Sequence, residues 1–381
     1  MAQLVRFIII FILLLSFVGC DQPAAPLSGL KIKIGVITPI SGSNSAAGKH
    51  GLKGIQFARQ LNSFLDNGDE IELIIEDDQS DPKKSVIALD KLVNENHVSA
   101  ILLLSGSNSA VAVSKVANKY ETPIIATIAT NPEAPRNSQF ISQLAFDDET
   151  QAIVAALFVR DELLIKRVAI FNNPNSIYSN YLAQKFADKL KSVDGIVTDF
   201  INLSEEGPNN YLDIIKMVQK KDPKLLYLPI NANAVLAIAK AAKEINWSPK
   251  MLATDGMLSR VIEQNKSDLK LLNGMLATDL YSSTMILSDY GKKVLDHINE
   301  NNIKITTHLL TGIEGYDFLL NAINQCEEPI SRLCINDMMH TQKDFTGITG
   351  IITINENGKT ERTLFVNTIE GEQLKSVVKV H

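Results

Sequence analysis

The body of the chain has no run of basic residues, and its 43 Asp and Glu outnumber its 37 Lys and Arg, for a formal net charge of −6. Proteins that bind nucleic acid usually present a clustered positive surface. The charge balance therefore argues against a nucleic-acid partner.

The sequence also lacks the motifs of common catalytic and cofactor sites. It contains no GxSxG, no HExxH, and no GxGxxG behind an apolar run. Residues 42–50 resemble a phosphate-binding loop, but five residues separate Gly42 from Gly48 where the motif needs four. His50 also stands where Ser or Thr would bind magnesium. We predict no enzyme activity, no cofactor and no metal site.

The six histidines are scattered, with no spacing typical of metal ligands or of a catalytic triad. The simplest interpretation of five of them is a surface position: His50, His97, His297, His308 and His340.

Cysteine is rare, with three in the whole chain and no CxxC pair. Cys326 and Cys334 are the two in the body of the chain. If the protein is exported, it meets an oxidising compartment in which such a pair can close a small loop. We predict a disulfide between them, and two buried free thiols on a helix are the alternative.

The first twenty residues are typical of an export signal. Arg6 precedes an apolar run over residues 7–18 that is shorter than the roughly 20 residues a transmembrane helix needs. We predict a signal peptide over residues 1–19. Residues 16–20 resemble a bacterial lipobox, which would make Cys20 the lipidated first residue of the mature protein; an uncleaved anchor or an incidental cysteine is the alternative. Residues 20–28 then form a tether.

These features place the protein in the bacterial periplasm or on the cell surface, held at a membrane by its lipid. Asp21 resembles the residue that keeps lipoproteins of enteric bacteria in the inner membrane.

The length of 381 residues predicts two domains, because single cores stop growing at roughly 250 to 300 residues. From residue 31 onward, short apolar runs alternate with amphipathic segments, which is typical of βαβ units and parallel sheets. The pattern stops near residue 126 and restarts at residue 168, so we expect two doubly wound α/β units. The expected strands are 32–38, 71–76, 100–104 and 123–126 in the first unit, and 168–171, 196–200, 225–228, 251–253 and 274–278 in the second. The expected helices are 48–64, 110–119, 232–245, 287–301 and 308–324, with others starting near residues 82, 178 and 211, and strands near 349–353 and 363–366 follow.

Small polar residues follow several of these strands. The hexapeptide SGSNSA occurs at 41–46 and again at 105–110, and a third polar turn spans residues 127–132. Ser and Asn can cap a following helix, and turns at the carboxyl ends of parallel strands present backbone N–H groups to ligands. The acidic run over residues 76–82 suggests either a cation site or, more simply, a helix cap formed by Asp81.

Four segments carry a family resemblance: residues 32–42, 76–85, 123–132 and 347–358. They resemble the branched-chain amino-acid-binding proteins of bacterial ABC importers. The resemblance implies a type I periplasmic binding protein fold, in which three crossovers join two Rossmann-like lobes around a ligand cleft. It assigns residues 29–147 plus 281–345 to the first lobe and residues 148–280 plus 346–381 to the second.

The resemblance also implies a ligand site. The turn from Ser105 to Ser109 would hold the α-carboxylate of an amino acid together with Thr130, and the Ile128 carbonyl would meet its α-ammonium. In the second lobe, Asp255 would pair with the ammonium, and Tyr178 would lie at the cleft. The complete set is Ser105, Ser107, Asn108, Ser109, Ile128, Ala129, Thr130, Tyr178, Asp255, Ala47 and Asn231.

Ala47 and Asn231 stand where the family's branched-chain binders place aromatic side chains. Loss of these rings removes apolar area on the order of 150 to 250 Å² each. We therefore expect a larger or more polar amino acid, a small amide or a related zwitterion as the ligand.

The predicted function is that of a transport receptor, which delivers its ligand to a membrane permease and its ATPase. The alternative keeps the fold but changes the role to a sensor or structural lipoprotein that acts on a membrane or cell-wall partner protein.

Overall fold

The computed structural model describes residues 29–203, 210–264 and 266–380. The predicted signal peptide, Cys20 and the tether lie outside the described residues. Within the described part of the chain, no helix is both long and apolar enough to cross a membrane.

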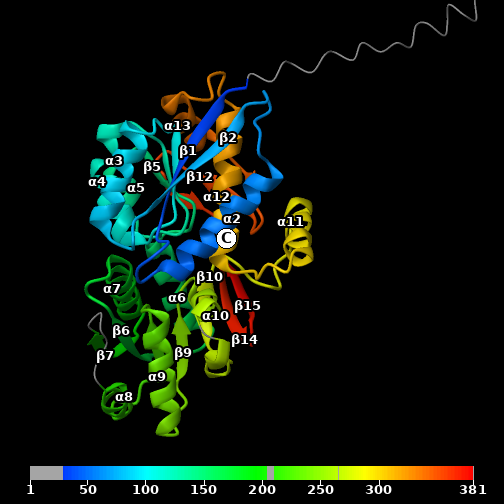
Figure 1. The fold of residues 1–381 in the computed structure, drawn as a ribbon. Helices are drawn as coiled ribbons and strands as arrows, with labels where there is room; N and C mark the ends of the chain where they lie inside the picture. Colours follow the sequence, from blue (N-terminus) through cyan, green and yellow to red (C-terminus); the bar gives the residue numbers. More distant parts are fainter. Residues whose placement is uncertain (1–28, 204–209, 265, 381) are drawn as a thin grey trace, which may run out of the picture.

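The first lobe is built on a five-stranded parallel sheet with the order β2-β1-β3-β4-β5 (Figure 1). The inner strands are buried on both faces, as parallel strands covered by helices usually are. Its strands are β1 (Lys31–Thr38), β2 (Glu70–Asp77), β3 (Ala100–Leu103), β4 (Ile124–Ala126) and β5 (Ile141–Gln143). The helices that alternate with them are α2 (Ser45–Leu61), α3 (Pro82–Asn94), α4 (Ser107–Tyr120) and α5 (Glu133–Asn137).

The second lobe contains a seven-stranded sheet with the order β15-β14-β10-β9-β8-β6-β7, in which β14 and β15 run antiparallel to their neighbours. Its strands are β6 (Arg167–Asn172), β7 (Ile196–Asn202), β8 (Leu225–Leu228), β9 (Lys250–Ala253), β10 (Leu276–Asp279), β14 (Leu364–Glu370) and β15 (Gln373–Val380). Its helices are α6 (Asp148–Asp161), α7 (Ile177–Ser192), α8 (Tyr211–Gln219), α9 (Ala232–Glu244), α10 (Met257–Gln264) and the 3₁₀ helix η2 (Lys266–Leu271).

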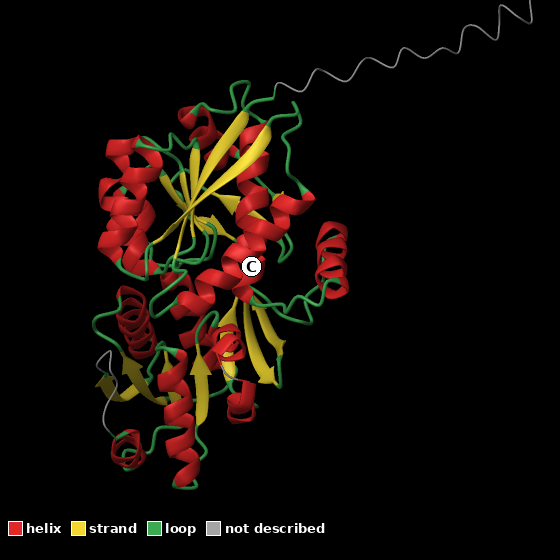
Figure 2. Ribbon diagram, viewed as in Figure 1, coloured by secondary structure: helices red, strands yellow, loops and turns green. Residues whose placement is uncertain are grey.

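Helices cover both faces of each sheet (Figure 2), so the predicted doubly wound α/β class is confirmed. After β10 the chain returns to the first lobe, where it forms α11 (Asp289–Glu300), α12 (Thr307–Asn324), α13 (Arg332–Thr341), β11 (Phe345–Thr346), β12 (Ile351–Ile354) and β13 (Thr360–Glu361). The chain therefore crosses between the lobes three times: after β5, after β10 and after β13.

The predicted lobe boundary, which assigns residues 346–381 to the second lobe, differs from the packing of this segment in the structure. Ile348, Ile352 and Ile354 are buried in the core of the first lobe, together with residues of β1 and α12. Because this segment pairs in a small three-stranded sheet on that lobe, the third crossing lies between β13 and β14.

The first and third crossings are tied together by Arg362, which lies in the third. Its guanidinium donates to the Leu144 carbonyl in the first crossing at 2.9 Å and to the Glu314 carboxylate on α12 at 3.0 Å. Glu314 also accepts from the Thr349 backbone N–H at 2.7 Å. Both charged side chains are almost fully buried, so this pair fixes the crossings relative to α12.

Two glycines allow α2 and α12 to pack closely. A Cβ added at Gly54 would lie 2.2 Å from the Leu309 carbonyl oxygen, and one added at Gly312 would lie 2.2 Å from the Gly51 carbonyl oxygen. Neither position accepts a side chain without moving a helix. This close contact holds the amino end of α12 beside α2.

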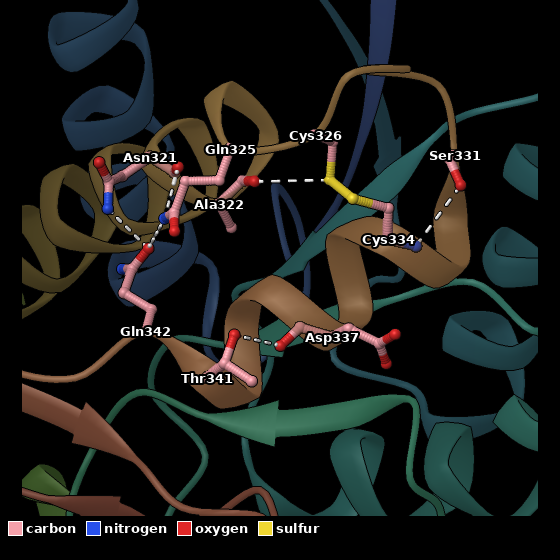
Figure 3. The surroundings of a disulfide bond; sticks show 9 residues. All are labelled: Asn321, Ala322, Gln325, Cys326, Ser331, Cys334, Asp337, Thr341 and Gln342. Atoms are coloured by element: carbon pink, nitrogen blue, oxygen red, sulfur yellow. Dashed lines mark hydrogen bonds between the residues drawn. A yellow bond between two sulfur atoms is a disulfide. The ribbon is translucent and has the colours of Figure 1, made fainter.

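Figure 3 shows the disulfide that joins Cys326, just after α12, to Cys334 on α13. The ends of the two helices are tied a second time by Gln342, whose side-chain oxygen accepts from Asn321 at 2.6 Å and from Gln325 at 3.1 Å. These contacts attach α13 to the first lobe.

The surface positions expected for the histidines hold only in part. His97 and His297 are exposed, and His50 and His340 are half-buried. The expectation is wrong for His308, which lies in the first turn of α12 and is only 3% exposed.

Candidate functional site

The carboxyl ends of the strands of the two lobes face one another, and the turns behind them make contact. Asn108 at the start of α4 donates to the Asn175 carbonyl at 3.2 Å and accepts from the Ile177 backbone N–H at 2.8 Å. Figure 1 shows α4 above α7, on either side of this contact. The predicted site residue Asn108 therefore joins the lobes directly.

Asp255 follows β9 in the second lobe and is the centre of a buried polar group. Its Oδ1 accepts from the Gln151 amide at 2.7 Å and from the Tyr178 hydroxyl at 2.6 Å. Tyr178 lies in the first turn of α7, which Ser176 caps by accepting from the Ser179 N–H. The structure thus brings Asp255 and Tyr178, two of the predicted second-lobe residues, into contact.

Asp148 is a site residue that the sequence reasoning missed. It is fully buried in the first turn of α6, and its backbone N–H donates to the Thr130 carbonyl at 2.9 Å. Among the described residues, neither of its carboxylate oxygens has a hydrogen-bond partner. Burial raises the pKa of Asp148 well above its ordinary value, and the nearby charge of Asp255 raises it further.

Thr130 comes from the first lobe and faces Asp148. The Thr130 hydroxyl lowers the pKa of Asp148 and so opposes burial and the charge of Asp255. The hydroxyl and the carboxylate do not meet the geometry of a hydrogen bond. The hydroxyl is buried and has no other partner among the described residues. A predicted first-lobe residue and an unpredicted second-lobe carboxylate therefore share one site.

Tyr227 on β8 lies behind these groups, with its ring stacked on Phe186 at 3.9 Å between centroids. Its hydroxyl is buried and has no partner in the described part of the chain. Burial raises the Tyr227 pKa well above its ordinary value, and the charges of Asp148 and Asp255 add to the effect. Tyr227 therefore lies within electrostatic range of both carboxylates.

Asp279 at the end of β10 fixes the turn that carries Asp255. Its carboxylate accepts from the Gly256 N–H at 3.0 Å and from the Thr307 hydroxyl of α12 at 2.8 Å. Burial, together with the charge of Asp255, raises the pKa of Asp279 to about 6. Because Thr307 belongs to the first lobe, Asp279 is a second direct link between the lobes.

The serine turn after β3 differs from the expectation. The hydroxyl of Ser105 donates to the Asp78 carboxylate. The hydroxyl of Ser85 lies between that carboxylate, at 2.7 Å, and the hydroxyl of Ser109, at 2.8 Å. These buried hydroxyls are occupied within the first lobe, so Ser105 and Ser109 do not offer their side chains to a ligand. Ser107 and the N–H groups in the first turn of α4 keep the predicted anion-binding geometry.

Neither copy of SGSNSA caps its helix through a side chain, which corrects the capping prediction. Asn44 and Gly106 are the N-cap residues, and neither forms a side-chain cap. In the first copy, Ser41 donates to Asp77 at 2.7 Å. Asp81 does cap α3, by accepting from the Lys83 N–H, as the acidic run predicted.

The other predicted residues are Ala47, Asn231, Ile128 and Ala129. Ala47 is buried on α2. Asn231 is exposed and caps α9 by accepting from the Ala234 N–H at 2.9 Å. Ile128 is half-buried, and the Ala129 carbonyl accepts from Gln143 at 3.2 Å. The Asn231 amide thus has a local structural role.

The arrangement offers groups that can bind a cation and groups that can bind an anion. Buried polar groups are almost always paired, so the unpaired oxygens of Asp148, Thr130 and Tyr227 mark the place where a ligand's polar atoms fit. Carboxylates favour an ammonium group, and the amino end of a helix favours a carboxylate. The site presents both within one interlobe region.

Comparisons with known proteins agree with this geometry. Residues 31–373 match the family described as periplasmic binding protein. The Leu/Ile/Val-binding protein BraC3 of Rhizobium johnstonii is 23% identical over 340 residues, which cover 88% of this chain and 90% of that protein.

Two solved structures share the fold. The branched-chain amino acid transporter substrate binding protein LivJ from Streptococcus pneumoniae, in complex with isoleucine, has a TM-score of 0.82 at 22% identity, covering 92% of this chain and all of that one. A solute binding protein of an ABC transporter from R. palustris, in complex with benzoate, has a TM-score of 0.80 at 14% identity, covering 92% of this chain and 96% of that one.

These likenesses confirm the type I periplasmic binding protein fold. The family match covers nearly the whole described chain, and it agrees with a site that has binding groups between two lobes. The chain belongs to the periplasmic binding protein family, whose members bind solutes outside the cytoplasm and are not enzymes.

Proposed function

We propose that the protein is the ligand-binding component of an ABC importer, which holds an amino acid or a related zwitterion between its lobes and delivers it to a membrane permease. The observation that carries this proposal is the fully buried Asp148 carboxylate, which has no hydrogen-bond partner among the described residues and lies near Asp255. Two carboxylates in one buried site are costly unless a cation lies between them.

In the proposed complex, the ligand's ammonium group lies against Asp148, Asp255 and the Tyr178 hydroxyl, near the Ile128 carbonyl. Its α-carboxylate lies at the amino end of α4, where it accepts from backbone N–H groups, Ser107 and Thr130. The carboxylate and ammonium groups thus meet side chains from both lobes, so ligand binding stabilises the closed arrangement.

A simple aromatic acid fits this site poorly, although the similar structure from R. palustris contains benzoate. Benzoate has a carboxylate but no cation, so it leaves the Asp148 oxygens without a partner and the Asp255 charge without a counter-ion. Repulsion between the ligand's charge and these carboxylates would lower its affinity. We therefore favour an amino-acid-like ligand.

The proposal includes export and a lipid anchor at Cys20, which the sequence of residues 1–20 supports. Mass spectrometry of the mature protein tests this part: a diacylglyceryl-modified Cys20 at the amino terminus is the expected result, and an intact Met1 would contradict it.

The function itself is tested by mass spectrometry of the ligand that copurifies with the protein, followed by calorimetric titration with a panel of amino acids, amides and benzoates. We expect 1:1 binding of an amino acid with a polar side chain. Tight binding of leucine with no response to polar compounds would exclude the proposed specificity. Binding of benzoates alone would exclude the ammonium site.

A further inference from the structure

Arg260 is a charged residue near the site that the proposed binding mode does not use. It lies on α10, with its backbone N–H donating to the Gly256 carbonyl at 3.0 Å, one turn after Asp255. A Cβ added at Gly256 would lie 4.0 Å from the Arg260 Nε and 3.2 Å from the Nε2 of His308. The guanidinium therefore reaches back over the turn that carries Asp255, toward α12 of the first lobe.

The electrostatics place Arg260 near the ligand groups as well. Burial raises the pKa of Tyr178 well above its ordinary value, the charge of Asp255 raises it further, and the charge of Arg260 opposes both. Arg260 is thus within electrostatic range of the hydroxyl that contacts Asp255. No Arg260 nitrogen forms an ion pair with Asp255 or Asp148 within the described residues, and Asp255 is hydrogen-bonded by Gln151 and Tyr178 instead.

The Nε of Arg260 is buried and has no hydrogen-bond partner in the part of the chain that the structure describes. An arginine stays charged and offers its donors in a fork that matches a carboxylate. Leaving such a donor buried without an acceptor is costly. A buried Nε–H of Arg260 without a partner among the described residues, beside the candidate site, is therefore best explained by an acceptor on the ligand.

The wall opposite Arg260 is polar. His308 is buried in the first turn of α12. The Nδ1 of His50, on α2, lies 3.4 Å from the hydroxyl oxygen of Thr306. His50 lies one turn after Ala47 on α2, where the family's branched-chain binders place an aromatic ring, and His308 lies on α12, which packs against α2. The region that would enclose a ligand's side chain is therefore lined in part by polar imidazole rings.

We propose that Arg260 binds a second carboxylate at the end of the ligand's side chain, so that the protein recognises an acidic amino acid. This inference rests on the proposed function, since it assumes that the ligand's ammonium lies against Asp255 and Asp148. The ammonium and α-carboxylate are held as described above. The side chain then extends past Gly256 toward Arg260 and His308.

The test is calorimetric titration of the full protein, freed of copurified ligand, with L-glutamate, L-aspartate, L-glutamine and L-leucine. We expect at least one of the two acids to bind ten-fold or more tightly than glutamine, which has nearly the same shape as glutamate but no side-chain charge. Arg260→Gln should lower the affinity for that acid at least thirty-fold and change the glutamine affinity less than three-fold.

Arg167→Gln is the matched control, because Arg167 is an arginine of the same lobe that donates to backbone carbonyls at the start of β6. It should bind all four compounds as the unmodified protein does. If Arg260→Gln does not fold, Arg260→Lys keeps the charge without the fork and should show a smaller loss that is still selective for the acid.

The outcomes separate the two proposals. If the protein binds none of the four compounds and no other amino acid, the proposed function and this inference both fail. If glutamine or leucine binds as tightly as the acids, or if Arg260→Gln weakens every ligand equally, the amino-acid site stands and the role assigned to Arg260 is wrong.

Discussion

The hydroxyl of Tyr178 donates to Oδ1 of Asp255 across 2.6 Å and so joins the first turn of α7 to the turn behind β9. The same oxygen accepts from Gln151 on α6. Three elements of the second lobe thus hold one carboxylate in place without neutralising its charge. An ordered, charged carboxylate is the group that an ammonium ligand requires.

Replacing either partner should weaken binding of the amino acid that the unmodified protein binds best. Asp255→Asn removes the charge and should lower the affinity ten- to hundred-fold, which corresponds to about 1.5 to 3 kcal/mol for a charge-assisted hydrogen bond. Tyr178→Phe should lower it less. Calorimetry measures both, with Tyr181→Phe as the control, because Tyr181 is on the same helix but contacts Glu149. Unchanged affinity in Asp255→Asn would overturn the site.

Asp148→Asn should separate stability from binding. In the protein without ligand, Asp148 is a buried carboxylate that is repelled by Asp255 and has no partner among the described residues. Removing the charge should raise the free energy of unfolding by about 1 kcal/mol, as is common where a binding site stores unfavourable interactions. The affinity for the ligand should fall at least ten-fold.

Urea denaturation and calorimetry measure the two effects. Asp161→Asn, at the other end of α6 and paired with Arg160, is the control and should change neither by much. A variant that is less stable and binds normally would show that Asp148 is a structural residue.

The sequence predicted the sheets because parallel strands are apolar on both faces. Asp255 and Tyr178 were implied only by the family resemblance, which matches them to positions behind two of these strands. The sequence missed α6, and with it Asp148. The buried face of α6 carries the polar residues Asp148 and Gln151, and the opposite face carries the apolar residues Ile153, Val154 and Leu157, so the helix has no clear amphipathic stripe. The partner of Ser105 could not be predicted either, since Asp78 reaches it from the end of β2, across β1.

Asn108→Ala should weaken ligand binding by opening the contact between the lobes. Two hydrogen bonds from this side chain reach Asn175 and Ile177, and each contributes about 0.5 to 1.5 kcal/mol. We expect a roughly five- to hundred-fold loss of affinity and, by small-angle scattering, a larger radius of gyration at partial saturation. Asn118→Ala is the control, because Asn118 lies on the same helix but bonds Ser138 within the first lobe. Equal effects of both variants would contradict a role in closure.

Asp317 should make the protein less stable as the pH rises from about 4 to about 6. Burial raises its pKa to about 6, although a hydrogen bond from Tyr290 opposes this, and the charge of Glu314 adds to the increase. The unfolded chain therefore loses the proton near pH 4 while the folded protein keeps it until about pH 6. This contribution to stability is complete below pH 4 and lost above pH 6, and amounts to about 3 kcal/mol.

Asp317→Asn should remove that contribution, so the difference in unfolding free energy between variant and unmodified protein should change with pH across this interval. Urea denaturation of both proteins at several pH values measures this difference in unfolding free energy. Asp289→Asn, whose side chain is 93% exposed, is the control and should follow the unmodified protein. Parallel pH profiles for Asp317→Asn and the unmodified protein would show that Asp317 ionises normally.

Removing the disulfide should lower stability without changing ligand affinity. The bond joins cysteines eight positions apart, and closing a loop of this size contributes about 2.5 kcal/mol in the chain-entropy model. The double variant Cys326→Ala, Cys334→Ala should lose about that much unfolding free energy. Affinity should be unchanged, since Cys326 follows the carboxyl end of α12, whose 18 residues extend about 27 Å from the end beside the site.

The α13 helix should remain attached in this variant, because Ile335 and Met339 are buried in the first-lobe core and Gln342 still accepts from Asn321. Denaturation of the unmodified protein with and without a reductant provides the control: the reduced protein should match the double variant, and the double variant should not respond to the reductant. A loss of affinity in the double variant would mean that the position of α13 is transmitted along α12 to Thr307 and His308 at the site.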